Sequence, residues 1–394
     1  MPVPAAEHIG ARIAWYRKLR RLTQQELADR AHISYSMVAK VEQGVRPATG
    51  GVVAAVARAL SVQTTDLTGQ PYLTELQQDE LDGLIQPIRE ALDLYDLGAD
   101  PDVVPRGIAA LAAEADQLCA LVRDGRLKDA ARTVPDLITE ATTAAHTAQT
   151  TEAWSVLAST YRTAYDITTK LGYPDLCVVA LDRLDWAAER ASDPVLAGMR
   201  QYLRSLVYLR AGQYRMGQRL VTVGMSTLAL ADPSRTRDVV TGQLHLGAAV
   251  LAARAGDGDT AAGYIAEAAR VSEATGEATR VHWLSFGPTN VATHRVAVLA
   301  EQSKYGEALE AASGLTIPAE WPASRVAAHL AEVARAQLVT GRTDQAQQTL
   351  QRAREKAPQQ TRYQPMVRET IAGLLSARRA TPGSLVNLAH WVGI

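Results

Sequence analysis

The chain has 394 residues, of which 47% are hydrophobic and 21% charged, with a formal net charge of −1. This length suits two or three domains, and the composition is that of an ordinary folded soluble protein. No apolar run approaches the ~18 residues that a membrane span needs, and the first residues lack a basic-then-apolar secretory signal, so we expect a cytoplasmic protein with no membrane partner. The two cysteines, Cys119 and Cys177, lie far apart among apolar neighbours. We interpret them as buried small side chains, not as a disulfide or a metal site.

The charge is unevenly divided along the chain. Residues 1–70 carry nine Lys/Arg against five Asp/Glu, whereas the remainder carries 32 against 37. A basic end on a mildly acidic body indicates a small surface for a polyanion. Many surface helices are as basic as this segment. The charge alone therefore does not establish binding of a polyanion, and a motif is needed to support it.

Residues 1–72 predict a domain of five short helices. The first buries Ile9, Ile13 and the Leu19/Leu22 pair and ends near residue 21. Thr23 and Glu26 have the spacing of a capping box, which starts a second helix over 24–31. Further helices are expected over 35–43, after the cap Ser34 and before Gly44 and Pro47, and over 49–60 and 65–68.

The second and third of these helices have the spacing of a helix-turn-helix. Ala28 is small where the third helix crosses, Ile33 fills the turn, and Val38 and Val41 anchor the third helix from below. The side chains left facing outward, where a recognition helix meets base edges, are Tyr35, Ser36, Met37 and Lys40. The alternative is a three-helix packing unit with no role in binding nucleic acid.

The segments 22–31, 41–44 and 52–67 together resemble the Cro/repressor (XRE) helix-turn-helix family. The resemblance implies that Gln24 contacts a phosphate, that Tyr35 and Ser36 read bases of double-stranded DNA, and that Lys40 reaches further along the groove. Gln43 and Arg46 are implied to clamp the DNA backbone. The chain departs from the family at His32, where glycine is usual; histidine tolerates a positive φ better than most residues.

After a connecting segment over 73–105, residues 106–394 predict helices throughout, with a repeated turn. In each repeat a turn residue is followed five positions later by a small residue, and the small residues are 47, 40, 44, 47 and 38 positions apart. The pairs are Gly125/Ala130, Gly172/Cys177, Gly212/Gly217, Gly256/Ala261, Ser303/Ala308 and Gly341/Ala346. Each unit is interpreted as a helical hairpin that must stack on its neighbours to bury its apolar face. A short helix over 385–394 is expected to cap the stack.

These hairpins resemble tetratricopeptide repeats, although they are longer than the usual ~34 residues. The whole chain is therefore expected to be all-α, with a five-helix head followed by a curved solenoid with a concave inner surface. The combination of this head and body resembles a group of actinomycete XRE regulators, whose members carry a segment of almost the same sequence as residues 282–296. More distantly it is similar to peptide-sensing quorum regulators of other Gram-positive bacteria. The resemblance implies a transcription factor that is controlled through its body.

One stretch of the body is unusual on its own terms. Phe286 is the only phenylalanine in the chain, and with Trp283 it precedes a helix on which Asn290 and His294 share a face. We predict that this face binds an effector, with Trp283 and Phe286 as an end wall. Counting from the repeat turns places three more residues on the inner surface: Tyr202, Gln243 and Arg335. The alternative is that Asn290 caps a turn and His294 is a satisfied interior polar group.

The chain carries no motif of an enzyme. It has no phosphate-binding glycine-rich loop, nucleophile elbow or paired metal-ligand spacing, so we expect no catalytic residues, no cofactor and no metal. We predict a homodimeric regulator that binds a partly palindromic operator and responds to a small molecule or peptide. The rival hypothesis is an interaction scaffold whose body docks a partner protein and whose head binds DNA only weakly.

Overall fold

A computed structural model describes residues 8–70, 75–378 and 382–394, and every regular element in these ranges is a helix. The prediction of an all-α chain is confirmed. The head, defined as residues 8–70, contains α1 (Ile9–Leu19), α2 (Gln24–Ala31), α3 (Tyr35–Glu42), α4 (Gly50–Leu60) and α5 (Thr64–Thr68). None of the described helices is both long and apolar enough to cross a membrane.

The local signals in the head form as predicted, with one exception. The Thr23 hydroxyl accepts from the Glu26 backbone N–H at 3.1 Å, and the Glu26 carboxylate accepts from the Thr23 backbone N–H at 2.7 Å, which completes the capping box. His32 has a φ of 54°, so it holds the left-handed turn between α2 and α3. Leu19, expected inside, is 61% exposed because α1 ends there and its last turn faces solvent.

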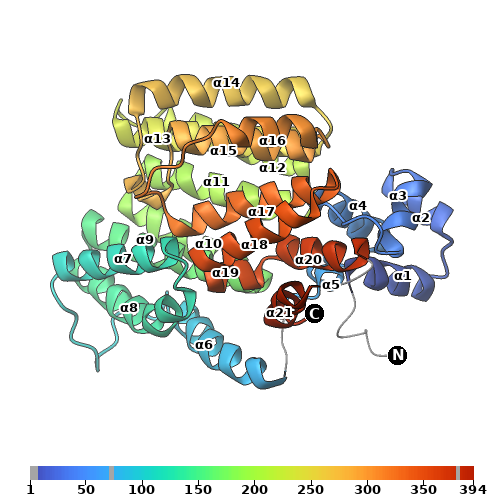
Figure 1. Ribbon diagram of the computed structural model, residues 1–394. Coiled ribbons are helices and arrows are strands. Elements are labelled where there is room, and N and C mark those ends of the chain that lie inside the picture. The colour runs from blue at the N-terminus through green and yellow to red at the C-terminus, as the bar shows by residue number, and fades with distance from the viewer. Residues whose placement is uncertain (1–7, 71–74, 379–381) are drawn as a thin grey trace.

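The body, defined as the described residues from 75 onward, is a stack of antiparallel helical hairpins (Figure 1). It opens with α6 (Glu75–Asp93). The hairpins are α7 (Ile108–Arg123) with α8 (Leu127–Ala148), α9 (Thr151–Leu171) with α10 (Pro174–Ala191), α11 (Pro194–Arg210) with α12 (Tyr214–Leu228), α13 (Arg235–Arg254) with α14 (Gly258–Thr275), α15 (Pro288–Glu301) with α16 (Tyr305–Ser313), and α17 (Ala323–Val339) with α18 (Thr343–Lys356). The chain ends with α19 (Pro358–Tyr363), α20 (Pro365–Ala377) and α21 (Gly383–Val392).

The predicted repeat turns are the hairpin turns of the structure. All six turn residues have a positive φ, between 61° at Ser303 and 91° at Gly172. The small residue that follows each turn is buried; Ala130, Ala261, Ala308 and Ala346 are each 0% exposed. Because these positions have little or no side chain, the second helix of each hairpin packs close to the first.

The stack of hairpins curls until its last members touch its first. α17 contacts α7, and α19 contacts both α8 and α9. Two side-chain amides of α19 bind across this junction: Gln359 Oε1 accepts from the Lys128 backbone N–H at 2.8 Å, and Gln360 Oε1 accepts from Lys170 Nζ at 2.8 Å. The first helices of the hairpins therefore surround a common axis. The side of these helices that points toward this axis is called the inner face.

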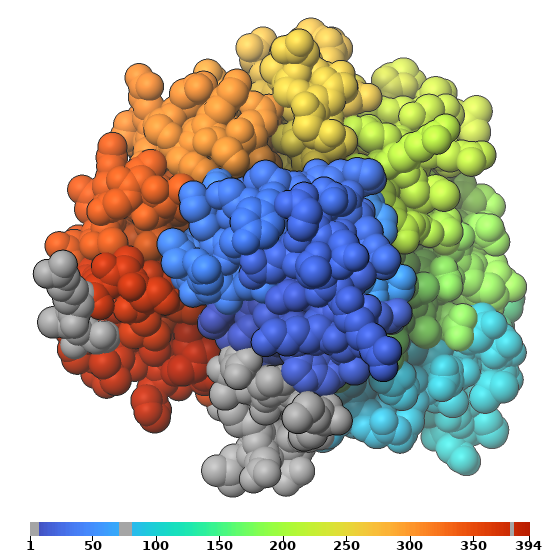
Figure 2. All heavy atoms as spheres, turned by 90° about the vertical axis from the view of Figure 1, so that its right-hand side faces the viewer, coloured from blue at the N-terminus to red at the C-terminus, as the bar shows by residue number. Residues whose placement is uncertain are grey.

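The head lies over one end of this ring (Figure 2). Arg58 Nη1 donates to the Gly212 carbonyl at 2.9 Å, the Ile9 backbone N–H donates to Glu369 Oε1 at 3.1 Å, and Gln70 Nε2 donates to the Tyr363 carbonyl at 3.3 Å. A Cβ at Gly212 would lie 2.5 Å from the Cβ of Ala54, so glycine is needed there both for its φ of 70° and for the close approach of α4. These contacts lie in the third hairpin and in α19 and α20, and the head thus joins the middle of the body to its end.

Candidate functional site

The predicted reading surface lies on the part of the head that faces away from the body, where Figure 1 shows α2 and α3. Tyr35 is 51% exposed, and Ser36, Lys40 and Gln43 are also exposed. Met37, Arg46 and Gln24 are half-buried at the edges of the same surface. Docking of the head on the body therefore leaves the outward face of α3 accessible.

Apolar and ionic contacts hold α3 in this position. Val38 and Val41 are each 2% exposed, and Ala28, where α3 crosses α2, is 1% exposed. Arg17 and Glu42 form an ion pair with Nε and Oε1 2.6 Å apart, and Glu42 also accepts from Gln24 Nε2 at 2.8 Å. The side chain predicted to contact a phosphate is thus oriented by the carboxylate that anchors the end of α3.

Comparison with known proteins agrees with this geometry. A helix-turn-helix family model matches residues 13–67. The N-terminal unit is a helix-turn-helix domain. An immunity repressor protein of Bacillus phage phi105 is 36% identical over 72 residues, which are 18% of this chain and 50% of that protein. The chain thus spans about half the length of this relative, and both similarities lie in the helix-turn-helix domain.

A solved structure covers much more of the chain at low similarity. It is that of Bacillus thuringiensis PlcR in complex with the peptide PapR7 and DNA. The alignment covers 78% of this chain and 94% of the PlcR chain. The TM-score is 0.30 and the sequence identity 14%.

Three of the predicted effector residues form one buried hydrogen-bonded chain on the inner face. Gln243 Nε2 donates to the Tyr202 hydroxyl at 2.7 Å, and Asn290 Nδ2 donates to Gln243 Oε1 at 3.2 Å. Arg325 Nη2, from α17, donates to Asn290 Oδ1. Asn290 is 0% exposed, and its amide nitrogen and oxygen each already have a partner, so it orients Arg325 from within the protein.

His294 lies one turn after Asn290, as the predicted shared face requires. Its Nδ1 is 2.8 Å from the Asn290 backbone carbonyl. Burial, reinforced by the nearby Arg325 guanidinium, lowers the pKa of His294 to about 3. At neutral pH the ring is therefore uncharged, with Nδ1 as the donor to that carbonyl.

The side chains of Phe286 and Trp283 make contacts with different parts of the body. Phe286 is 0% exposed, and a Cβ at Gly242 would collide with its ring, so Phe286 fills the core against α13. Its predicted place in an end wall was wrong, because the turn after Trp283 directs it inward. The bridge between Ala278 and Phe286 holds this turn closed.

Trp283 reaches instead to the opposite side of the ring. Its Nε1 donates to Asp116 Oδ1 of α7 at 2.9 Å, and its carbonyl accepts from Arg162 Nη2 of α9 at 3.2 Å. His282, Trp283 and Ser285 have φ values of 42°, 53° and 58°. Three strained residues within four positions require surroundings that impose the conformation, and such strain is concentrated at functional sites.

Arg335 belongs to a network of ion pairs beneath the head. It pairs with Glu332 at 2.8 Å and with Glu301 at 3.4 Å, and Glu301 also pairs with Arg254 at 3.2 Å. Burial alone would raise the pKa of Glu301, but the two arginines outweigh it and hold that pKa below its usual value. The Arg254 guanidinium lies against Gly50 of the head, so this network runs from the inner face to the start of α4.

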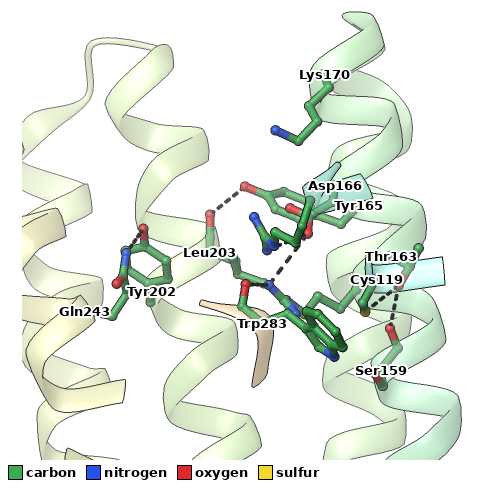
Figure 3. Close-up of polar contacts among 12 residues, drawn as sticks. Cys119, Ser159, Thr163, Tyr165, Asp166, Lys170, Tyr202, Leu203, Gln243 and Trp283 are labelled. Carbon is green, nitrogen blue, oxygen red and sulfur yellow. Dashed lines mark hydrogen bonds and ion pairs between the residues drawn. The ribbon is translucent and has the colours of Figure 1, made fainter. Parts of the chain in front are cut away.

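A cluster of basic residues on the inner face was not anticipated. Its members, from four helices, are Arg123, Arg162, Lys170, Arg210 and Arg325, with Asp166 as the carboxylate among them. Figure 3 shows Asp166 and Lys170 extending from α9, with the Tyr165 hydroxyl donating to the Leu203 carbonyl at 3.2 Å. The four-residue spacing of 162, 166 and 170 is visible in the sequence. Stacking of neighbouring hairpins brings α7 and α11 to this face of α9, and the closing of the ring adds α17.

The cysteines are free and buried, as expected. Cys119 Sγ lies 3.2 Å from the Thr163 hydroxyl and Cys177 Sγ lies 3.1 Å from that of Thr169, and burial raises the pKa of both thiols. Among the described residues, no group of three His, Cys, Asp or Glu side chains is placed to hold a metal ion.

Proposed function

We propose that this chain is a cytoplasmic DNA-binding transcriptional regulator whose body binds an effector on its inner face. The observation that carries the proposal is the position of the helix-turn-helix head. Its reading surface on α3 is open, while α4 rests on the ring that the body forms. A change in the ring therefore has a direct mechanical route to the DNA-binding surface.

In this proposal the start of α3 enters the major groove. Tyr35 and Ser36 meet base edges, with Met37 beside them, while Lys40, Gln43, Arg46 and Gln24 contact phosphates and fix the register. One head makes few phosphate contacts, so useful affinity requires two heads on half-sites about one helical turn apart or a multiple of it. We assign the pairing of two chains to the body, which light scattering of the full chain tests directly.

The effector, a small molecule or a peptide, acts through the inner face. Tyr202, Gln243 and Asn290 position its contacts, and the network of Arg335 and Arg254 links that face to the head. Binding that favours one curvature of the ring shifts the hairpin ends on which α4 rests. The spacing or orientation of paired heads then changes, and with it the affinity for the operator.

The test is selection of bound duplexes from a random DNA pool by the full-length chain, followed by footprinting. Enrichment of a partly palindromic site, protected at micromolar or lower protein concentration, supports the proposal. If no sequence is enriched and a partner protein is recovered with the body, the protein is an interaction scaffold instead.

A further inference from the structure

Three cations on the inner face have only uncharged hydrogen-bond partners among the described residues. Lys170 Nζ donates to Gln360 Oε1 at 2.8 Å, and Arg210 Nη1 donates to the Tyr165 hydroxyl at 3.4 Å. Arg325 donates to the amide oxygen of Asn290, and its Nε is buried with no hydrogen-bond partner. The ordinary companions of buried basic side chains, carboxylates, are missing from all three.

The carboxylate nearest to them is already engaged. Asp166 lies 3.2 Å from Arg123 Nη2 and 3.6 Å from Arg162 Nη2. The single negative charge of Asp166 is thus shared by two arginines. The other three cations of the cluster add further positive charge. The cluster as a whole carries a surplus of positive charge.

These groups are close enough to influence one another. Burial lowers the pKa of Lys170 to about 7; Asp166 opposes this shift, while the positive charges of Arg123, Arg325 and Arg210 reinforce it. The cations belong to α9, α7, α17 and α11, so they converge from around the ring. Their mutual repulsion is a standing cost of the fold.

The cluster is also partly accessible. Arg210 is exposed, and Lys170 and Arg325 are half-buried. A small ligand can therefore reach all three side chains.

We propose that this cluster binds a small dianion, either a phosphate ester or a dicarboxylate, through Lys170, Arg210 and Arg325. The proposal rests on the proposed function, because this dianion is the effector. Guanidinium groups bind phosphate and carboxylate oxygens in pairs, and the lysine adds a compact charge. Asn290, which holds Arg325 in place, is a positioning residue for the same ligand.

Calorimetric titration of the full chain tests the assignment. The probes are glycerol 3-phosphate and succinate, at constant ionic strength with sodium chloride as the balance, because screening alone changes the affinity of anions. One probe is expected to bind with one site per chain, and which of the two binds separates the phosphate from the dicarboxylate. Lys170→Gln and Arg210→Gln keep a hydrogen-bond donor and are each expected to weaken binding about tenfold or more. The matched control is Arg295→Gln, an exposed arginine on α15, which is expected to bind as the wild type does.

A second measurement guards against variants that merely disturb the fold. Without any probe, Lys170→Gln is expected to raise the melting temperature by about 1–3 °C, because it relieves repulsion from Arg123, Arg325 and Arg210. Equal affinity in wild type and Lys170→Gln, or no binding of either probe at millimolar concentration, overturns the assignment, and so does a lower melting temperature of Lys170→Gln. Specific DNA binding without anion binding removes this inference alone, whereas anion binding without any enriched DNA site removes the proposed function.

Discussion

Asn290 and Gln243 join α15 to α13 through a single buried hydrogen bond, with Nδ2 and Oε1 3.2 Å apart. An exposed asparagine in a groove tolerates replacement, and the sequence alone predicts that Asn290→Ala stays within ~1 kcal/mol of the wild-type stability if the side chain faces a groove. Since the residue is 0% exposed, we now expect the free energy of unfolding to fall by about 1–3 kcal/mol, because Gln243 and Arg325 each lose a partner. Urea denaturation measures this. Asn387→Ala, at an exposed position of α21, is the control and is expected to change little; equal stability of both variants would contradict the network.

DNA binding provides the second prediction. Tyr35, at the start of α3, is expected to specify bases, so Tyr35→Ala costs about 1–3 kcal/mol on a selected operator and less on random DNA. Arg46→Ala is expected to weaken both similarly and to flatten the salt dependence, because its contact is with a phosphate. Fluorescence anisotropy at several salt concentrations measures both variants. If Tyr35→Ala leaves specific and non-specific binding unchanged, α3 is not the reading helix.

The sequence predicts those features of this fold that local chemistry determines. The capping box at Thr23, the left-handed turn at His32 and the turn glycines of the hairpins each follow from one residue type in one backbone conformation. Burial of the small residues after the turns follows from the same repeat. Local signals therefore predict the elements and their pairing well.

Local signals do not predict features that depend on the curvature of the stack of hairpins. The closure of the ring, marked by Lys170 and Gln360, joins residues 190 positions apart. No periodicity indicates this contact, so the sequence does not predict that Arg325 joins the basic residues of α7, α9 and α11. Phe286 was misplaced for a related reason: the turn at Trp283 and Ser285 uses left-handed residues that carry no glycine signal. Its direction is fixed by packing against Gly242.

Acid sensitivity is the third prediction. Burial lowers the pKa of His282 and His329 to about 4 and that of His294 to about 3, whereas the unfolded chain titrates near 6.5. As the pH falls from 6.5 to about 4, the unfolded state binds protons that the folded state does not, so stability decreases, by up to about 1.4 kcal/mol per pH unit for each histidine.

The variant His329→Gln isolates one histidine from this sum. Glu332 and Glu369 have raised pKa values, which oppose the histidines below neutral pH, so the difference between variant and wild type is the informative quantity. Thermal denaturation between pH 4 and 7 is expected to show a shallower loss in His329→Gln. The exposed His390→Gln is the control. If the pH profile of His329→Gln runs parallel to that of the wild type, His329 binds its proton over the same pH range in the folded and unfolded states, and its pKa is not lowered by burial.

The docking of the head on the ring provides the last prediction. Ala54 is 1% exposed and packs on the turn at Gly212, where even one added methyl group has no room. Ala54→Leu is therefore expected to displace the head while both parts stay folded, because the added atoms meet the body and not the centre of the head. Hydrogen exchange is expected to accelerate in the turn at 211–213 and at Arg254. Operator binding is expected to persist because the outward face of α3 is untouched, but the response of that binding to an effector is expected to disappear. Ala109→Leu, at an exposed position on α7, is the control for the size of the substitution. If Ala54→Leu retains the wild-type exchange pattern and the full response, contact between α4 and the ring does not transmit the signal.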